Sequence, residues 1–218
     1  KNFEEYNSNT LLINRSFNIN SSGINWKKLK GGILGGSVIT GEFNVGDEIE
    51  IRPGYTNKGK NENEKMKSFP IKSKILSIYT ETSPILNANK NGLIAIGTDI
   101  EPFYCQNNKL AGNVIGKKDN LPSVYTEIDV NFEVLKNKYC NWNPKINDLI
   151  TVFIDTSFAN SKLIKISGKK KYKGTIKLFK PICLTKDSNV MICQNCKKDN
   201  IVKIVGNGKF IKGKIIVE

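Results

Sequence analysis

The sequence predicts an all-β protein built from many short strands. Ile49 and Ile51 alternate with charged residues, which is the two-residue period of a half-buried strand. Three apolar runs, 93–96 (LIAI), 151–154 (TVFI) and 215–217 (IIV), are short and rich in β-branched residues. No segment of ten or more residues has a convincing helical pattern. Short strands separated by glycine-containing turns are typical of barrels and sandwiches.

The chain length allows one large domain or two small ones, because 218 residues lie between the usual sizes of one and two domains. The polar segment 117–122 (KKDNLP) ends in proline and separates two strand-rich blocks of similar length. We therefore expect a linker tail over 1–9, a first domain over 10–119 and a second over 120–218. The Lys/Asn/Glu-rich segment 56–68 is interpreted as a mobile loop between strands.

The composition favours a binding protein over most classes of enzyme. The chain contains no histidine, which excludes histidine-based acid–base catalysis and histidine-ligated metal sites. It also contains no G-x-x-x-x-G-K-[ST] motif that would hold nucleotide phosphates. No apolar run approaches the roughly 20 residues of a membrane span, so no membrane partner is expected, and no signal peptide is visible.

The charge is strongly basic, with 34 Lys and Arg against 20 Asp and Glu and a net charge of +14. Such a surplus is typical of a nucleic-acid partner. Lysine and asparagine are both abundant, so a merely solvated basic surface is an equal alternative. The five cysteines are odd in number and indicate a reducing intracellular compartment. The single pair Cys193-x-x-Cys196 is interpreted as two ordinary thiols, because a structural zinc needs four ligands, and no metal is expected.

The most informative stretch is 30–40 (KGGILGGSVIT), which contains Gly31, Gly32, Gly35 and Gly36. Glycines weaken a strand, so this density needs a reason. They permit a bulge at a barrel corner, or they let the backbone approach another chain or a ligand closely.

The longer segment 30–54 (KGGILGGSVITGEFNVGDEIEIRPG) strongly resembles the second domain of the gamma-subunit family of eukaryotic and archaeal translation initiation factor 2. The resemblance implies two consecutive β-barrels like domains II and III of a translational GTPase similar to elongation factor Tu, over 10–119 and 120–218. The GTPase domain is expected to be absent from this sequence. Further matches are weaker individually and lie at 15–17, 92–105, 109–116, 121–132 and 202–217.

The resemblance also implies a function. The family carries methionyl initiator tRNA to the small ribosomal subunit in a GTP-dependent complex in the cytoplasm. Its second domain docks the alpha subunit, and its GTPase domain contacts the beta subunit. We expect the two barrels to be non-catalytic, with no cofactor of their own. GTP and magnesium are expected only for the full-length protein.

By the same resemblance, the glycine-rich strand forms one wall of the pocket for the aminoacylated end of the tRNA. The glycines would let the backbone approach the acceptor end, and Lys30 would contact a phosphate. Arg52 is a further candidate, for which an ion pair at the strand end is the simpler alternative. The candidates for this wall are Lys30, Gly31, Gly32, Gly35, Gly36, Ser37, Arg52, Gly97 and Thr98.

A second basic cluster lies in the other half of the chain. Lys169, Lys170, Lys171 and Lys173 flank two glycines, as at the tip of a hairpin. They are either solvated or in contact with RNA phosphates. Where the family carries a basic run in its third domain, this sequence has 193–196 (CQNC), so no arginine role is transferred there.

Two other interpretations stay open. One is a different translational GTPase of similar build, such as the selenocysteine-specific elongation factor. The other is a scaffold whose barrels bind proteins, with the lysine surplus reflecting codon usage.

Overall fold

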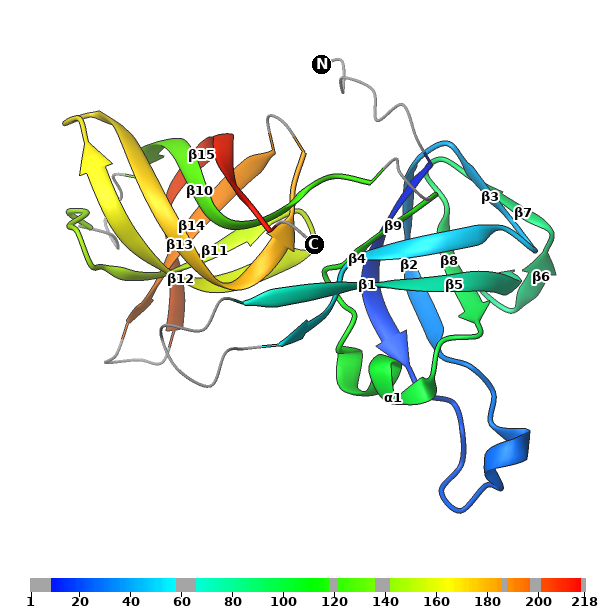
Figure 1. Ribbon diagram of the computed structural model, residues 1–218. Coiled ribbons are helices and arrows are strands. Elements are labelled where there is room, and N and C mark those ends of the chain that lie inside the picture. The colour runs from blue at the N-terminus through cyan, green and yellow to red at the C-terminus, as the bar shows by residue number, and fades with distance from the viewer. Residues whose placement is uncertain are drawn as a thin grey trace. The chain divides into compact units, whose positions relative to one another are not determined.

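The computed structural model describes residues 9–57, 66–117, 121–135, 142–185, 188–196 and 201–216. The chain divides into two compact units (Figure 1): Lys1–Tyr55 with Phe69–Leu121, and Thr56–Ser68 with Pro122–Glu218. Each unit is a closed, antiparallel barrel of six strands, which confirms the predicted all-β, two-barrel fold. The linker tail expected over 1–9 and the loop expected over 56–68 lie mostly outside the described residues.

The first barrel has the strand order β4-β9-β1-β2-β8-β5 and closes through pairing of β4 with β5. Strand β6 pairs antiparallel with the end of β5, and β3 pairs with β7 in a separate two-stranded sheet. The helices of this unit are short: η1 (Trp26–Lys28), α1 (Pro102–Cys105) and η2 (Gln106–Asn108). Its strands are β1 (Thr10–Phe17), β2 (Ile33–Thr40), β3 (Glu42–Asn44), β4 (Glu48–Asn57), β5 (Lys67–Thr80), β6 (Ser83–Ile85), β7 (Asn87–Asn89), β8 (Leu93–Thr98) and β9 (Val114–Gly116).

Alternation along each strand fills the first barrel. In β8, Ile94, Ile96 and Thr98 are buried, while Leu93 and Ala95 lie on the other face. Because side chains in a strand alternate between its two faces, this sequence buries one face and exposes the other. The core comprises Leu11, Ile13, Leu34, Val38, Phe43, Ile49, Ile51, Ile75, Ile78, Ala88, Ile94, Ile96, Ile100, Cys105, Leu110 and Ile115.

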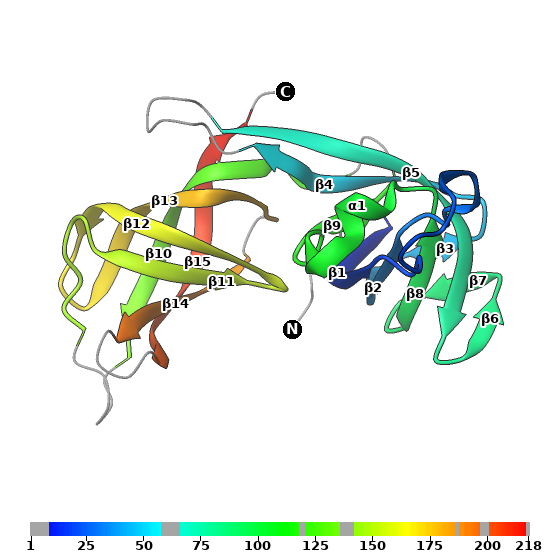
Figure 2. The same ribbon diagram turned by 90° about the horizontal axis from the view of Figure 1, so that it is seen from below.

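The second barrel has the closed order β10-β13-β12-β11-β14-β15 (Figure 2). Its core is built from the same kind of residues, with Trp142 and Phe132 stacked at 6.0 Å between ring centroids. Trp142 Nε1 also donates a hydrogen bond of 3.0 Å to Asp148. The strands are β10 (Val124–Val134), β11 (Leu149–Ile154), β12 (Ser157–Ser167), β13 (Lys171–Cys183), β14 (Asn189–Cys196) and β15 (Ile201–Ile215).

Candidate nucleic-acid interface

The glycine-rich strand β2 lies in the middle of the first barrel's sheet, between β1 and β8. Its register against β1 shifts by one residue between Ile13 and Arg15, which are paired with Gly36 and Gly35 respectively. Asn14 is therefore the extra residue of a β-bulge. A bulge is thus present beside the glycines, but its extra residue belongs to β1 and not to the glycine-rich strand.

Three of the four glycines are required by packing inside the barrel. A Cβ atom on Gly31 would collide with the carbonyl of Thr98, and one on Gly32 would collide with the Cys105 thiol. A Cβ on Gly36 would collide with the carbonyl of Leu12 in β1. Packing within the barrel is therefore a sufficient reason for these three glycines. Contact of their backbone with tRNA stays a prediction.

Gly35 is the exception among the four. A Cβ atom there would meet nothing closer than 3.8 Å, at the ring of Phe17. Gly35 and Ser37 alternate with buried Leu34, Gly36 and Val38, so they face the outside of the barrel. Gly97 in β8 pairs directly with Ile33 and lies on the same outer face. These three positions of the predicted wall therefore lie together on the outer face of the barrel and form a small neutral surface.

Thr98 does not face this surface. Its side chain is 2% exposed, and its hydroxyl donates a hydrogen bond of 2.6 Å to the carbonyl of Gly32. The same hydroxyl accepts a bond of 3.3 Å from the Ile100 amide. Gly32 and Ile100 are themselves joined, by an amide-to-carbonyl bond of 2.8 Å. Thr98 therefore fastens the start of β2 to the end of β8, and its hydroxyl is occupied.

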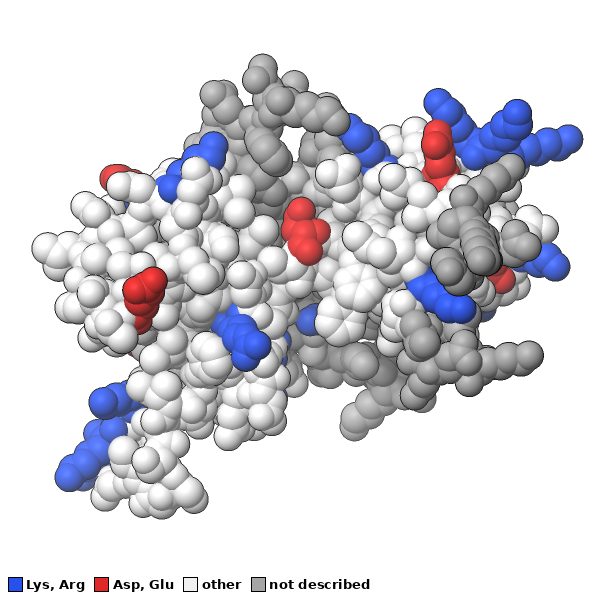
Figure 3. All heavy atoms as spheres, turned by 180° about the vertical axis from the view of Figure 1, so that it is seen from behind, with Lys and Arg blue, Asp and Glu red and all other residues white. Residues whose placement is uncertain are grey.

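Lys30 lies at the base of the loop that projects from the first barrel. Its amide donates to Asn20 Oδ1 at 2.8 Å, and Asn20 Nδ2 donates to its carbonyl at 2.7 Å. This pair of bonds closes the loop and leaves the Lys30 side chain exposed. Lys27 and Lys28 on the same loop are exposed as well, and Figure 3 shows basic side chains on the projecting loop.

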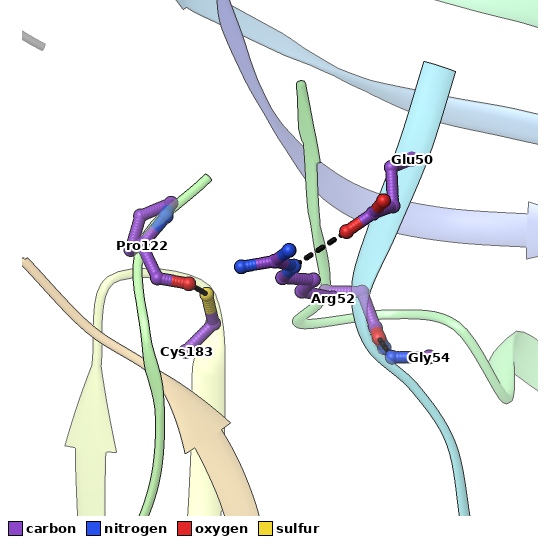
Figure 4. A network of polar contacts seen from close by, with 6 residues as sticks. Glu50, Arg52, Gly54, Pro122 and Cys183 are labelled. Carbon is purple, nitrogen blue, oxygen red and sulfur yellow. Dashed lines mark hydrogen bonds and ion pairs between the residues drawn. The ribbon is translucent and has the colours of Figure 1, made fainter. Parts of the chain in front are cut away.

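Arg52 is held in an ion pair. Its Nε lies 2.6 Å from Glu50 Oε1 (Figure 4), and the Glu50 carboxylate is almost fully buried. A buried carboxylate needs such a partner, because leaving it unpaired costs several kcal/mol. The strand-end ion pair that is the simpler alternative for Arg52 is therefore present. Figure 4 also shows, within the second unit, the Cys183 thiol bonded to the carbonyl of Pro122 at 3.1 Å.

The hairpin lysines of the second barrel belong to a much larger basic surface. Strand pairing forms a row across four neighbouring strands, in the order Lys162, Lys177, Glu127 and Lys214. A neighbouring row joins Lys173, Asn131 and Lys209. We call this surface the lysine face: it consists of Lys162, Lys165, Lys171, Lys173, Lys177, Lys209, Lys212 and Lys214, on strands β12, β13 and β15.

Few acidic groups offset the lysine face. Lys171 lies 3.8 Å from Glu133 and Lys214 lies 3.9 Å from Glu127, both in weak pairs near the surface. Asp129 accepts a hydrogen bond of 2.7 Å from the Thr175 hydroxyl. Among the described residues, no ion pair involves the remaining six lysines of the face. Lys169 and Lys170 lie at the hairpin turn beside it and are exposed.

A polar pocket of about 340 Å³ lies on the first barrel at the end of β1. Two of its residues are locked together, since the Ser16 amide donates to Asn108 Oδ1 at 3.1 Å. None of the lining side chains titrates near neutral pH, so the pocket suits hydrogen bonding and not acid–base chemistry. It is lined by Ser16, Phe17, Asn18, Asn20, Gln106, Asn107 and Asn108.

Titration around the site is governed by burial and hydrogen bonding. Burial raises the pKa of the Cys105 thiol, packed beside Gly32, to about 11. Burial likewise raises the pKa of Cys193 in the second barrel. The Ser73 hydroxyl, which donates to Asp99 at 2.6 Å, holds the pKa of that carboxyl below its usual value. Both cysteines are therefore protonated thiols at neutral pH and poor nucleophiles.

The described residues bring no three Cys, Asp or Glu side chains together as a metal site. The side chain of Cys196 lies outside the described residues, so the interpretation of the Cys193-x-x-Cys196 pair stays a prediction. None of the described helices is long and apolar enough to cross a membrane.

Known proteins resemble the two-barrel chain along nearly all of its length, although no protein-family model matches it. The gamma subunit of eukaryotic translation initiation factor 2 from Schizosaccharomyces pombe is 32% identical over 94% of this chain. The chain is a homologue of that gamma subunit. The gamma subunit of the same factor from Encephalitozoon cuniculi is 30% identical, and the protein named subunit 3 of the same factor from Drosophila melanogaster is 31% identical. Both matches also cover 94% of this chain.

The gamma-subunit homology covers only part of each relative. The chain spans about half the length of the curated relatives it matches: 47% of the S. pombe protein, 46% of the E. cuniculi protein and 44% of the Drosophila protein. Among solved structures, apo translation elongation factor SelB from Methanococcus maripaludis matches with a TM-score of 0.70 over 99% of this chain and 45% of SelB. Since its sequence is only 13% identical, this likeness shows the fold alone.

Proposed function

We propose that this chain is the tRNA- and subunit-binding portion of a translation initiation factor 2 gamma subunit. In this proposal the two barrels help to bind methionyl initiator tRNA in a GTP-dependent complex and deliver it to the small ribosomal subunit in the cytoplasm. The observation that carries the proposal is the 32% identity to the gamma subunit over 94% of the chain, together with two closed barrels.

The proposed role of the first barrel is to present a shaped backbone surface to the aminoacylated end. The outward positions Gly35, Ser37 and Gly97 are neutral and small, and a backbone surface of this kind can hydrogen-bond phosphate or ester oxygens. Lys30 stands beside it with an exposed ammonium group. The packing of Gly31, Gly32 and Thr98 keeps this surface in one conformation.

The proposed role of the second barrel is electrostatic. Most lysines of the lysine face are exposed and lack strong acidic partners, as RNA-phosphate contacts require. The hairpin residues Lys169 and Lys170 extend that surface at its turn. Contacts of this kind add affinity without reading sequence, which suits a factor that binds RNA by its shape.

The proposal assigns GTP and magnesium to another part of the full-length protein. The 218 residues contain no P-loop motif of the kind that holds nucleotide phosphates, and the chain by itself is proposed not to be an enzyme. The alpha subunit is proposed to dock on the first barrel, and the beta subunit on the GTPase domain.

The test is isothermal calorimetry of the alpha subunit's C-terminal domain against the whole chain. We expect saturable one-to-one binding that survives the Lys173→Gln, Lys209→Gln double variant of the second barrel. A loop variant of the first barrel, Lys27→Glu with Lys28→Glu, should weaken binding of the alpha subunit's C-terminal domain. A folded chain that shows no binding would overturn the gamma-subunit proposal.

A further inference from the structure

We propose that an aromatic strip on the first barrel binds unpaired nucleotides of RNA by base stacking. The strip consists of Tyr55, Phe69, Phe103 and Tyr104, with Lys109 at one end. The inference goes beyond the proposed function, because it uses none of the residues of the predicted wall and requires no folded tRNA.

The four rings form a continuous chain of contacts. Tyr55 in β4 and Phe69 in β5 lie 6.3 Å apart between ring centroids. Tyr55 and Tyr104 lie 5.8 Å apart, and Tyr104 and Phe103 of α1 also lie 5.8 Å apart. Tyr104 is partly buried against the barrel core and anchors the strip. Two strands and a helical turn thus bring residues from distant parts of the sequence together.

The outer rings of the strip remain in solvent. Tyr55 is 46% exposed, Phe69 is 49% exposed and Phe103 is 56% exposed. Large apolar side chains that are exposed singly are common on protein surfaces, whereas a contiguous exposed group marks an interaction site. Tyr55 and Phe69 are inclined by only 31°, so both can offer a ring face to the same ligand.

A fixed positive charge lies at the end of the strip. Lys109 Nζ lies 3.5 Å from the centre of the Phe103 ring and donates a hydrogen bond of 3.2 Å to the Phe103 carbonyl. The ammonium group is therefore held in place by a cation–π contact and a hydrogen bond. Rings for bases beside a cation for the phosphate are the two components of a single-strand binding surface.

A second aromatic pair, of which only one ring is exposed, shows what distinguishes the strip. Phe153 and Phe158 of the second barrel stack at 5.7 Å, and Phe158 is 59% exposed. Strand pairing places exposed Met191 next to Phe153. No cation–π contact is found at this pair in the described structure. Phe158 is thus a control of similar exposure without the charged component.

The experiment measures binding of fluorescein-labelled r(U)8, r(A)8 and r(A)8 ending in ACCA to the full chain by fluorescence anisotropy. The variants are Tyr55→Ala, Phe103→Ala and Lys109→Gln, with Phe158→Ala as the control. Each ring removed should weaken binding about fivefold or more, because stacking on an aromatic side chain contributes about 1–3 kcal/mol per base. Phe158→Ala should stay within about twofold of the unaltered chain.

Tyr55→Leu keeps an apolar side chain but lacks a flat ring, so it should weaken oligonucleotide binding as much as Tyr55→Ala does. Circular dichroism checks that each variant is folded.

Equal affinity for the three oligonucleotides identifies an internal unpaired segment as the ligand, and preference for ACCA identifies a tRNA 3′ end. Unchanged oligonucleotide affinity in the ring variants would overturn the proposal. So would loss of alpha-subunit binding with oligonucleotide binding intact, which would make the strip a protein-docking surface. Failure of the strip leaves the alpha-subunit result of the proposed function unaffected.

Discussion

The two barrels have the same number of strands and equally apolar cores, yet they present different candidate surfaces. In the first barrel, the surface around Gly35 depends on close backbone approach and on hydrogen bonds buried beneath it, such as that of Thr98. In the second barrel, the lysine face consists mainly of exposed side chains, and its ion pairs are weak and lie near the surface. The first kind of surface depends on precise packing, whereas the second depends on summed charge. Substitutions should therefore affect the first barrel through folding and the second through salt-dependent binding.

The largest expected effect is that of Gly31→Ala in the first barrel. Its Cβ atom would collide with backbone, which cannot rotate away as a side chain can, so we expect a loss of about 1–3 kcal/mol in the free energy of unfolding. Gly35→Ala is the matched control, since its Cβ atom meets only ordinary contacts, and it should cost less than about 1 kcal/mol.

Urea unfolding followed by circular dichroism measures both glycine variants. When Trp26 is replaced by phenylalanine, the fluorescence of buried Trp142 reports on the second barrel alone. The urea midpoint of that fluorescence transition should be the same in both glycine variants as in the unaltered chain. Equal destabilisation by the two substitutions would contradict the packing explanation for Gly31.

Thr98→Val should have the next largest effect. The substitution keeps the shape of the side chain and removes the hydroxyl that bonds to Gly32 and Ile100. We expect a loss of about 1–2 kcal/mol, since a buried amide loses its partner. Thr98→Ser keeps the hydroxyl, so it should retain most of the free energy of unfolding that Thr98→Val loses, in the same unfolding measurement. If Val and Ser behave alike, the hydroxyl does not fasten β2 to β8.

The lysine face should respond with a smaller, graded effect on binding and none on folding. Replacing Lys173 and Lys209 by glutamine should make the negative slope of log K against log salt shallower, by about 0.7–0.9 for each phosphate that is no longer neutralised, measured with initiator tRNA from about 50 to 200 mM salt. The control double variant, Lys72→Gln with Lys90→Gln on the first barrel, should leave the slope unchanged. An unaltered slope in both variants would mean that the lysine face is only solvated.

The smallest effect concerns pH. The pKa of Asp99 lies below its usual 3.8 because of the Ser73 hydroxyl, so this carboxylate stabilises the folded state above that pH. The contribution is lost as the pH falls below about 4. Ser73→Ala should raise the pKa of Asp99, measured by NMR titration, and reduce the difference in stability between about pH 3 and pH 7. An unchanged pKa would show that the hydroxyl is not its cause.

Single residues show how far the sequence could predict this arrangement. The run 93–96 is predicted as a strand and lies in β8, because its alternation reflects which face is buried. The ion pair of Arg52 with Glu50 is foreseeable from their two-residue spacing on one strand. The resemblance places Thr98 on the tRNA-facing wall, but the side chain points inward, since the sequence does not reveal the hydrogen bond to Gly32. The sequence indicates the lysine face only at its hairpin tip.

Local pattern alone determined the strands, the β-rich class, the basic charge and, through 30–54, the family that the chain resembles. These properties are encoded over a few residues, by alternation and by glycine spacing. Only the tertiary structure decided which glycines are required for packing, and it alone assembled the aromatic strip and the lysine face. Both surfaces join strands far apart in sequence, and barrel closure and strand register determine which of their side chains become neighbours.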